Sequence, residues 1–402
     1  MTRSPTSAAV LFAVAVLGSA CLRAAPSTAV GTARQTTDGA LAAGNIDSQI
    51  DALDQLFARS KARSAVRLAS LADLLQIRAQ YFGRISDWDR ALAVSAEAVK
   101  AAPRNGEILL SRAAGLAGVH RFDEALLALD QAEKLDEGGA KTDSVRASIL
   151  QARGDLDGAV TLRERAVQLH KTVTTLGGLA AAYGARRDLP RAEATFAEAA
   201  AIYRDSAPFP LAWIDFQRGM MLEREGRLDD ARPLYAAALQ RLPGYAQAAS
   251  HLASLEALRG QRDRAEALLR PLLTATDDPE YPGQLAGLLR DQGRTAEADS
   301  LHAAASAGYD KLLLRHPDAF ANHAARFFLP DDPARALTLA QRNLKLRSTW
   351  EAFDLALSAA AAARDLQAGC ALATQALQRP SPPPRIARLA AQAKTNCTVV
   401  SR

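Results

Sequence analysis

A short phrase recurs about every 34 residues along the chain, and it constrains the fold more than any other feature. Each copy has a charged or glycine-containing turn, followed by a small residue that opens an apolar run. That small residue stands at Ala91, Ala125, Ala159, Ala192, Ala231, Ala265, Ala298, Ala336 and Gly369. The successive intervals are 34, 34, 33, 39, 34, 33, 38 and 33 residues. Such a period is typical of repeat architectures, in which each unit buries its apolar face only against its neighbours.

The composition favours helices for these repeats. Hydrophobic residues make up 49% of the 402 residues and charged residues 23%, which excludes a chain that is disordered throughout. Aromatic residues reach only 5%, whereas β-sandwiches and barrels are rich in aromatic and β-branched residues. Three cysteines are too few for a disulfide scaffold. We therefore predict an all-α fold.

The repeat resembles the tetratricopeptide repeat, a pair of helices of about 34 residues. The fifth copy carries the matching residues Gly219, Leu222, Ala231, Tyr235, Ala238 and Pro243. The fourth copy carries Leu176, Ala180, Tyr183, Ala192, Phe196 and Ala199. The resemblance spans about Leu71 to Arg379 and implies a right-handed α-solenoid of about nine repeats. It also implies that protein or peptide partners are held in a concave groove lined by the first helix of each pair.

Two intervals and both ends depart from the repeat. In the 39-residue interval, Pro208 and Pro210 predict an extended link before Trp213. In the 38-residue interval, an apolar-periodic run predicts one long helix over 296–315. We expect a short helix over 47–63 before the repeats and a capping helix over 384–395 after them, so that the solenoid occupies 46–402.

The N-terminal residues resemble an export signal. Arg3 is followed by an uncharged apolar run over 8–18 and by small residues before Cys21, which predicts a signal peptide over 1–20. Residues 17–21 resemble a bacterial lipobox with the leucine one position too early. Cys21 is therefore a candidate lipidation site, and ordinary cleavage near Ala20 is the alternative. An alanine-, threonine- and glycine-rich stretch predicts a flexible tether over 21–45.

No pattern in the sequence predicts catalysis. A zinc-protease histidine pair, a nucleophile elbow, a phosphate loop and a dinucleotide fingerprint are all missing from the sequence. His316 and His323 are seven residues apart, but Pro317 interrupts any helix between them. We expect no catalytic residue, cofactor or metal.

The net charge is +5, from 49 basic and 44 acidic residues, and no basic run stands out, so we expect no nucleic-acid partner.

The expected inner positions of the first helices are small or neutral. They are Gln76, Gln80, Ser144, Ser148, Gly177, Ala181, Ser250, Ser254, Gly283 and Gly287. The chaperone-tail-binding members of the family place Lys, Arg and Asn at such positions, so this mode of binding is disfavoured. One segment differs, because Trp213, Phe216 and Met220 share a helical face and are candidate partner-binding anchors. The alternative is that these three residues pack the enlarged joint between two units.

Cys370 and Cys397 are a candidate disulfide. If Cys21 is lipidated, an even number of cysteines remains in an oxidising compartment, and a bond would fasten the capping helix to the last repeat. It would close a loop of 27 residues and contribute about 3 kcal/mol. The alternative is one buried cysteine and one free thiol near the C-terminus.

The resemblance to the tetratricopeptide repeat, together with the export signal, implies a non-catalytic scaffold of the bacterial cell envelope that binds proteins or peptides. The membrane contact would be a lipid anchor only, with the protein periplasmic or held at the outer membrane. The oligomeric state is open. The alternatives are a periplasmic enzyme, or a small-molecule or glycan sensor that uses the groove near Trp213.

Overall fold

The repeats form nine helix pairs in a computed structural model, which describes residues 34–59, 63–135, 138–380 and 382–400. The first five pairs are α2 (Ala65–Phe82) with α3 (Ile85–Ala101), α4 (Gly106–Gly118) with α5 (Phe122–Glu133), α6 (Ala140–Arg153) with α7 (Leu156–Leu169), α8 (Val173–Ala185) with α9 (Leu189–Ile202), and α10 (Phe209–Arg224) with α11 (Leu228–Arg241). The remaining four are α12 (Ala246–Leu258) with α13 (Arg262–Leu269), α15 (Glu280–Asp291) with α16 (Thr295–Arg315), α17 (Pro317–Phe328) with α18 (Pro333–Leu346), and α19 (Trp350–Ala362) with α20 (Leu366–Gln378). The described residues contain no strand. The prediction of an all-α solenoid of tandem helix pairs is confirmed.

Close crossings of helix backbones hold the pairs together. All eight alanines of the repeated phrase have relative exposures of 1% or less, from Ala91 to Ala336, and Gly369 is buried with them. In the fifth pair, the ring of Tyr235 lies directly over Gly219 of the partner helix. A small residue lets two backbones approach, and a bulky side chain from the neighbouring helix fills the remaining space. The apolar core of the solenoid is built in this way.

Both irregular intervals have the expected effect. An extended link over residues 203–208 separates α9 from α10, and Pro210 lies in the first turn of α10. The long helix α16 runs from Thr295 to Arg315, and Pro317 starts the next helix. A four-residue helix, α14 (Leu272–Ala275), lies in the connection between α13 and α15.

The two ends differ from the sequence prediction. Helix α1 spans Gly39–Arg59, so the predicted tether over 21–45 is wrong for its last residues, and the helix begins earlier than predicted. The helix begins there because the Asp38 carboxylate accepts a hydrogen bond from the backbone N–H of Leu41 at 2.9 Å. The capping helix α21 spans Pro384–Val400, five residues beyond the predicted end. The predicted signal peptide and Cys21 lie outside the described residues.

The solenoid winds back on itself. The turn between α2 and α3 meets the connection before α15, because Asp277 accepts hydrogen bonds from the backbone N–H groups of Ile85 and Ser86. Asp89 of α3 pairs with Arg315 and His316, which follow one unit later. We call this line of contacts the seam. It also includes His120 Nδ1, 3.1 Å from the carbonyl oxygen of Asp318, and the Ser348 N–H, which donates to the carbonyl oxygen of Arg153 at 3.2 Å.

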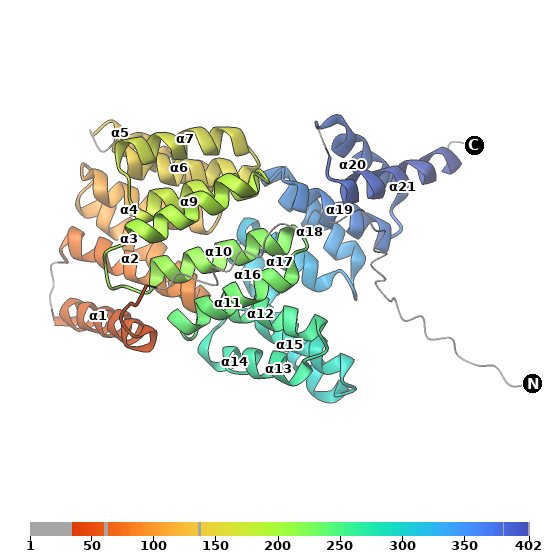
Figure 1. Cartoon of the computed structure of the whole chain (residues 1–402), viewed down its shortest axis with the longest axis horizontal. Coiled ribbons are helices and arrows are strands. Elements are labelled where there is room, and N and C mark those ends of the chain that lie inside the picture. The colour runs from red at the N-terminus through yellow and green to blue at the C-terminus, as the bar shows by residue number, and fades with distance from the viewer. Residues whose placement is uncertain (1–33, 60–62, 136–137, 381, 401–402) are drawn as a thin grey trace, which may run out of the picture.

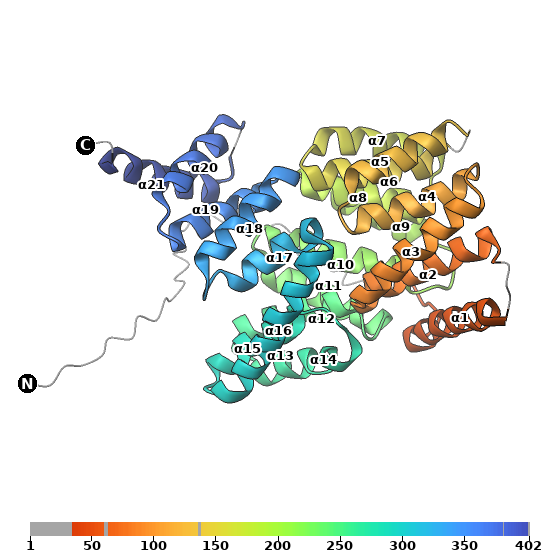
Figure 2. The same cartoon turned by 180° about the vertical axis from the view of Figure 1, so that it is seen from behind.

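The seam joins the turns of the first three pairs to the connections that precede α15, α17 and α19. An aromatic contact also joins the two windings, because the ring centroids of Tyr81 and Tyr245 lie 5.0 Å apart. In Figure 1, α1–α9 lie to the left and α18–α21 to the right, with α10–α17 between them; Figure 2 shows the same arrangement from behind. The seam therefore brings two windings of the helix pairs side by side.

Candidate ligand-binding hollow

A pocket of about 290 Å³ lies between α15, α16 and α17, on the inner side of the seventh and eighth pairs. Gly283 and Gly287 are one turn apart on α15, and a Cβ atom added at Gly287 would meet no atom within 4 Å. Phe327 lies over Gly283, and its ring centroid is 5.0 Å from that of Tyr309. The two glycines and two rings shape the pocket, which we call the inner pocket.

Charged and polar side chains converge on this pocket. They are Glu280, Gln284, Arg290, His302, His323, Arg326 and Asp331. The sequence expectation that the inner surface lacks converging polar groups is therefore wrong. The reason is spacing, because these residues are scattered over 52 positions and meet only when neighbouring pairs stack.

Glu280 and His323 form an imidazole–carboxylate pair in the inner pocket. His323 Nδ1 lies 2.8 Å from Glu280 Oε2. The charge of Glu280 raises the pKa of His323, and His323 in turn lowers the pKa of the Glu280 carboxyl. Burial and the charge of Glu280 raise the pKa of nearby Asp278. Glu280 is also the first residue of α15, where the helix dipole favours a negative charge.

A second imidazole–carboxylate pair lies on the neighbouring units. His251 Nδ1 of α12 is 2.8 Å from Glu223 Oε2 of α10, and the hydroxyl of Tyr235 donates to the same carboxylate oxygen. The partnership with His251 lowers the pKa of Glu223 against the opposing effect of burial. Burial and the charge of Glu223 raise the pKa of Tyr235.

Three of the neutral residues predicted for inner positions, Gln76, Ser250 and Ser254, bond to residues of a neighbouring first helix. Gln284 Nε2 donates to Ser254 Oγ at 2.6 Å, and Ser250 Oγ lies 2.9 Å from Gln284 Oε1. Gln76 donates in the same way to the carbonyl oxygen of Ser111 at 3.3 Å. These bonds link successive first helices across the inner face.

The three predicted anchors on α10 lie in different surroundings. Phe216 is 3% exposed and packs within 5.1 Å of Tyr245 and 5.7 Å of Tyr235, measured between ring centroids. For this residue the structure favours the alternative, in which the stripe packs a joint. Trp213 and Met220 are half-buried, and the indole ring of Trp213 lies over Gly177 of α8.

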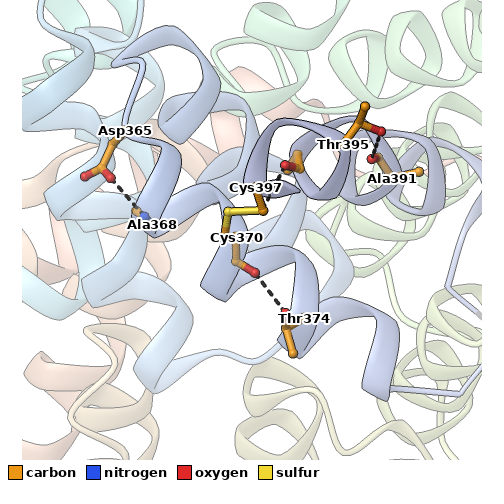
Figure 3. The surroundings of a disulfide bond; sticks show 8 residues. Asp365, Ala368, Cys370, Thr374, Ala391, Thr395 and Cys397 are labelled. Atoms are coloured by element: carbon orange, nitrogen blue, oxygen red, sulfur yellow. Dashed lines mark hydrogen bonds between the residues drawn. A yellow bond between two sulfur atoms is a disulfide. The ribbon is translucent and has the colours of Figure 1, made fainter. Parts of the chain in front are cut away.

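The predicted cysteine pair lies at the C-terminal end, away from the inner pocket. Cys370 of α20 and Cys397 of α21 are joined by a disulfide, with Cα atoms 5.9 Å apart (Figure 3). Cys397 lies inside the helix because α21 is longer than predicted. Asp365 caps α20 by accepting from the N–H of Ala368 at 2.9 Å. The bond fastens the last helix onto the ninth pair.

The histidines that attracted attention in the sequence have separate partners. His316 is buried against Asp89 at the seam, whereas His323 pairs with Glu280 in the inner pocket. Within the described ranges, no group of three or more His, Cys, Asp or Glu residues is arranged to hold a metal ion. In the same part of the chain, no helix is long and apolar enough to cross a membrane.

A family comparison matches residues 222–286 to the tetratricopeptide repeat. This segment covers the end of α10, α11–α13 and the first half of α15, which have the helix-pair geometry seen along the rest of the solenoid. Residues 222–286 are thus similar to the tetratricopeptide repeat in both sequence and helix arrangement. A comparison with curated protein sequences gave no match.

Solved tetratricopeptide-like structures resemble the whole solenoid only distantly. The human IFIT1 dimer with PPP-AAAA is 15% identical, and the match covers 83% of this chain and 77% of that one, with a TM-score of 0.48. The Cut9–Hcn1 hetero-tetramer of the APC/C is also 15% identical, with 73% and 55% covered and a TM-score of 0.46. With such values, these structures support no inference about the ligands or partners of this chain.

Sequence reasoning missed the Glu280–His323 pair and the winding that encloses the inner pocket. The available signal was weak but present. Glu280 is the first residue of α15 and His323 the seventh of α17, so the two residues hold different positions in their repeats. Alignment of the two units by their helices would have placed both residues in the first two turns of neighbouring first helices, without indicating that they pair.

Proposed function

We propose that this protein is a scaffold of the bacterial cell envelope, which binds protein or peptide partners in the hollow of its superhelix. The observation that carries the proposal is the inner pocket, because it combines open space at Gly287 with aromatic walls and converging polar groups. Stacked helix pairs hold these groups on rigid elements, as recognition of a partner requires. Tetratricopeptide repeats in general serve protein interaction, which agrees with this use of the inner face.

The export part of the proposal comes from the N-terminal sequence. A signal peptide over 1–20 and a lipid on Cys21 would place the solenoid on the periplasmic side of a membrane, joined to it through the residues before α1. Mass spectrometry of the mature N-terminus tests this part. An acylated Cys21 is expected, and a mature N-terminus without an acyl group contradicts the anchor.

Site-specific photocrosslinking in cells tests the binding site directly. A photoreactive phenylalanine analogue replaces Gly287 in the inner pocket, where an added Cβ atom meets no atom within 4 Å. The matched control carries the same analogue at Gly44 on the exposed face of α1, where an added Cβ atom also meets none. Each glycine lies within a helix, so the two variants test the same change in two places.

We expect a discrete protein adduct from position 287 and none from position 44. Capture of the same proteins at both positions, or no adduct at 287, contradicts the proposal. The adduct from 287 should also disappear when Phe327 is replaced by alanine, because Phe327 forms one wall of the pocket.

A further inference from the structure

A second, larger pocket lies at the C-terminal end of the solenoid, between α19, α20 and α21. Its volume is about 830 Å³, and we call it the terminal groove. None of the described residues lines both the terminal groove and the inner pocket, which lies between α15, α16 and α17. The terminal groove is therefore a separate feature of the molecule.

Apolar side chains from three helices line the terminal groove. They recur one helical turn apart on each helix, and they are Leu357, Ala360 and Ala361 of α19, Leu366 and Gly369 of α20, and Leu389 and Ala393 of α21. Leu366 is 44% exposed, so part of this apolar lining is open to solvent. A Cβ atom added at Gly369 would be 3.9 Å from the Cβ atom of Ala393 and 4.0 Å from that of Ala360. Small residues thus leave space between the three helices.

The disulfide holds two walls of the terminal groove together. Cys370 follows the lining residue Gly369 on α20, and Cys397 lies two residues after the lining residue Thr395 on α21. Figure 3 shows the bond passing directly from one helix to the other. Because the link is covalent, α21 cannot move away from α20 at this end. The terminal groove is therefore pre-formed, as binding sites for small molecules usually are.

One end of the terminal groove carries a cation. Arg364 lies in the turn between α19 and α20, and its side chain has no ion pair or hydrogen bond within the ranges that the structure describes. The neighbouring Asp365 accepts a hydrogen bond from the backbone N–H of Ala368 at 2.9 Å, and the N-terminus of α20 offsets its negative charge. Leu357 precedes Arg364 by seven residues, so the apolar lining extends about 10 Å away from the cation.

The size of the terminal groove favours a small ligand over a protein. Its volume lies within the range of about 300–1,000 Å³ that is typical of small-molecule sites. Its walls comprise 11 residues, whereas a standard protein interface has about 20–30 residues on each side. An apolar passage with an unpaired cation at one end matches a molecule that has one apolar chain and one anionic head.

We propose that the terminal groove binds a free fatty acid, with the alkyl chain between α19, α20 and α21 and the carboxylate at Arg364. Transfer of the methylene groups from water to the apolar walls drives binding. The Arg364 guanidinium donates hydrogen bonds to the carboxylate, for which its planar fork is well suited. The proposal is independent of the scaffold function, because it concerns a different pocket and a different class of ligand.

Calorimetric titration of the full chain with dodecanoate tests the proposal, with octanoate and dodecyltrimethylammonium as comparison ligands below their micelle concentrations. Gly369→Leu fills the groove, since its Cβ atom fits without overlap and the rest of its side chain occupies the open space. Arg364→Asn removes the cation, and asparagine tolerates the positive φ at this position. The matched controls are Ala391→Leu and Arg388→Gln, at exposed positions of α21 that do not line the groove.

Dodecanoate should bind at one site per chain, and its affinity should fall about tenfold or more in Gly369→Leu and Arg364→Asn but not in the two controls. Octanoate should bind more weakly, by up to about fourfold for each missing methylene. Dodecyltrimethylammonium should also bind more weakly, because its head carries the charge of Arg364. Failure of dodecanoate to bind, equal loss in the controls, or equal binding of the ammonium compound overturns the proposal. A wild-type dimer that Gly369→Leu dissociates would assign the groove to a second copy and overturn it as well.

Photolabelling of the wild type provides a second measurement that requires no variant. A fatty acid with a diazirine in its alkyl chain is bound and irradiated, and the adduct is located by mass spectrometry of peptides. The adduct should lie within residues 357–369 or 389–395 and should disappear when dodecanoate is in excess. Adducts only in other segments, or adducts that dodecanoate does not displace, contradict the proposal.

Discussion

Replacement of Gly219 by alanine should destabilise the fifth helix pair, although alanine is the better helix former. A Cβ atom at Gly219 would lie 2.7, 2.9 and 3.1 Å from three ring atoms of Tyr235. That ring is fully buried, and its hydroxyl is held by Glu223, so the ring has little freedom to move away. Overpacking of this kind costs about 1–3 kcal/mol, and the helix propensity of alanine returns about 1 kcal/mol. We expect a net loss of up to about 2 kcal/mol.

Gly287→Ala is the matched control for this substitution. It also lies inside a first helix, but its Cβ atom would meet nothing within 4 Å, so only the propensity gain of up to about 1 kcal/mol applies. Urea unfolding followed by circular dichroism measures both variants. The two substitutions should shift the midpoint in opposite directions. A Gly219→Ala variant as stable as Gly287→Ala would refute the idea that tight crossings hold the pairs together.

Three further predictions concern the seam, the disulfide and a buried histidine. Asp277→Ala removes the acceptor for two backbone N–H groups at the start of α3. Urea unfolding should show a loss of about 1–2 kcal/mol in the free energy of unfolding, and an unchanged value would show that this contact is not formed. Reduction of the Cys370–Cys397 disulfide should lower the free energy of unfolding by about 3 kcal/mol, measured by thermal unfolding with and without reductant. Two free thiols in the unfolded, unreduced protein would contradict the bond. Burial and the charge of Arg347 lower the pKa of His120 to about 4, so the unfolded chain binds the proton first as the pH falls. The free energy of unfolding should therefore decline between about pH 6.5 and pH 4, by about 2–3 kcal/mol at most. The decline should be smaller in the His120→Asn variant, which is chosen because asparagine tolerates the positive φ at this turn. Identical pH profiles for the two proteins would contradict this assignment.

The regular part of the fold could be predicted because it depends on local spacing. A small residue every 33 or 34 positions fixes where two helices cross, and Ala125 or Ala265 can be recognised without knowledge of any distant contact. Pro208 and Pro317 mark helix boundaries for equally local reasons, since each restricts the backbone at its own position.

The winding and the hollow could not be predicted, because they depend on small rotations that accumulate over several pairs. Asp277 caps a helix that starts 192 residues earlier, and Asp89 meets Arg315 across 226 residues. Nothing in the neighbourhood of Asp277 or Asp89 indicates those partners.

The contact between the two windings is the central structural claim, and a crosslink across the seam tests it most directly. The Asp89→Cys/Arg315→Cys double variant, in a Cys21→Ser background, replaces an ion pair between α3 and α16 with two thiols. A short bismaleimide should join them rapidly within one molecule in buffer and slowly in urea. Equal rates in buffer and urea, or crosslinks only between molecules, would show that the windings do not touch.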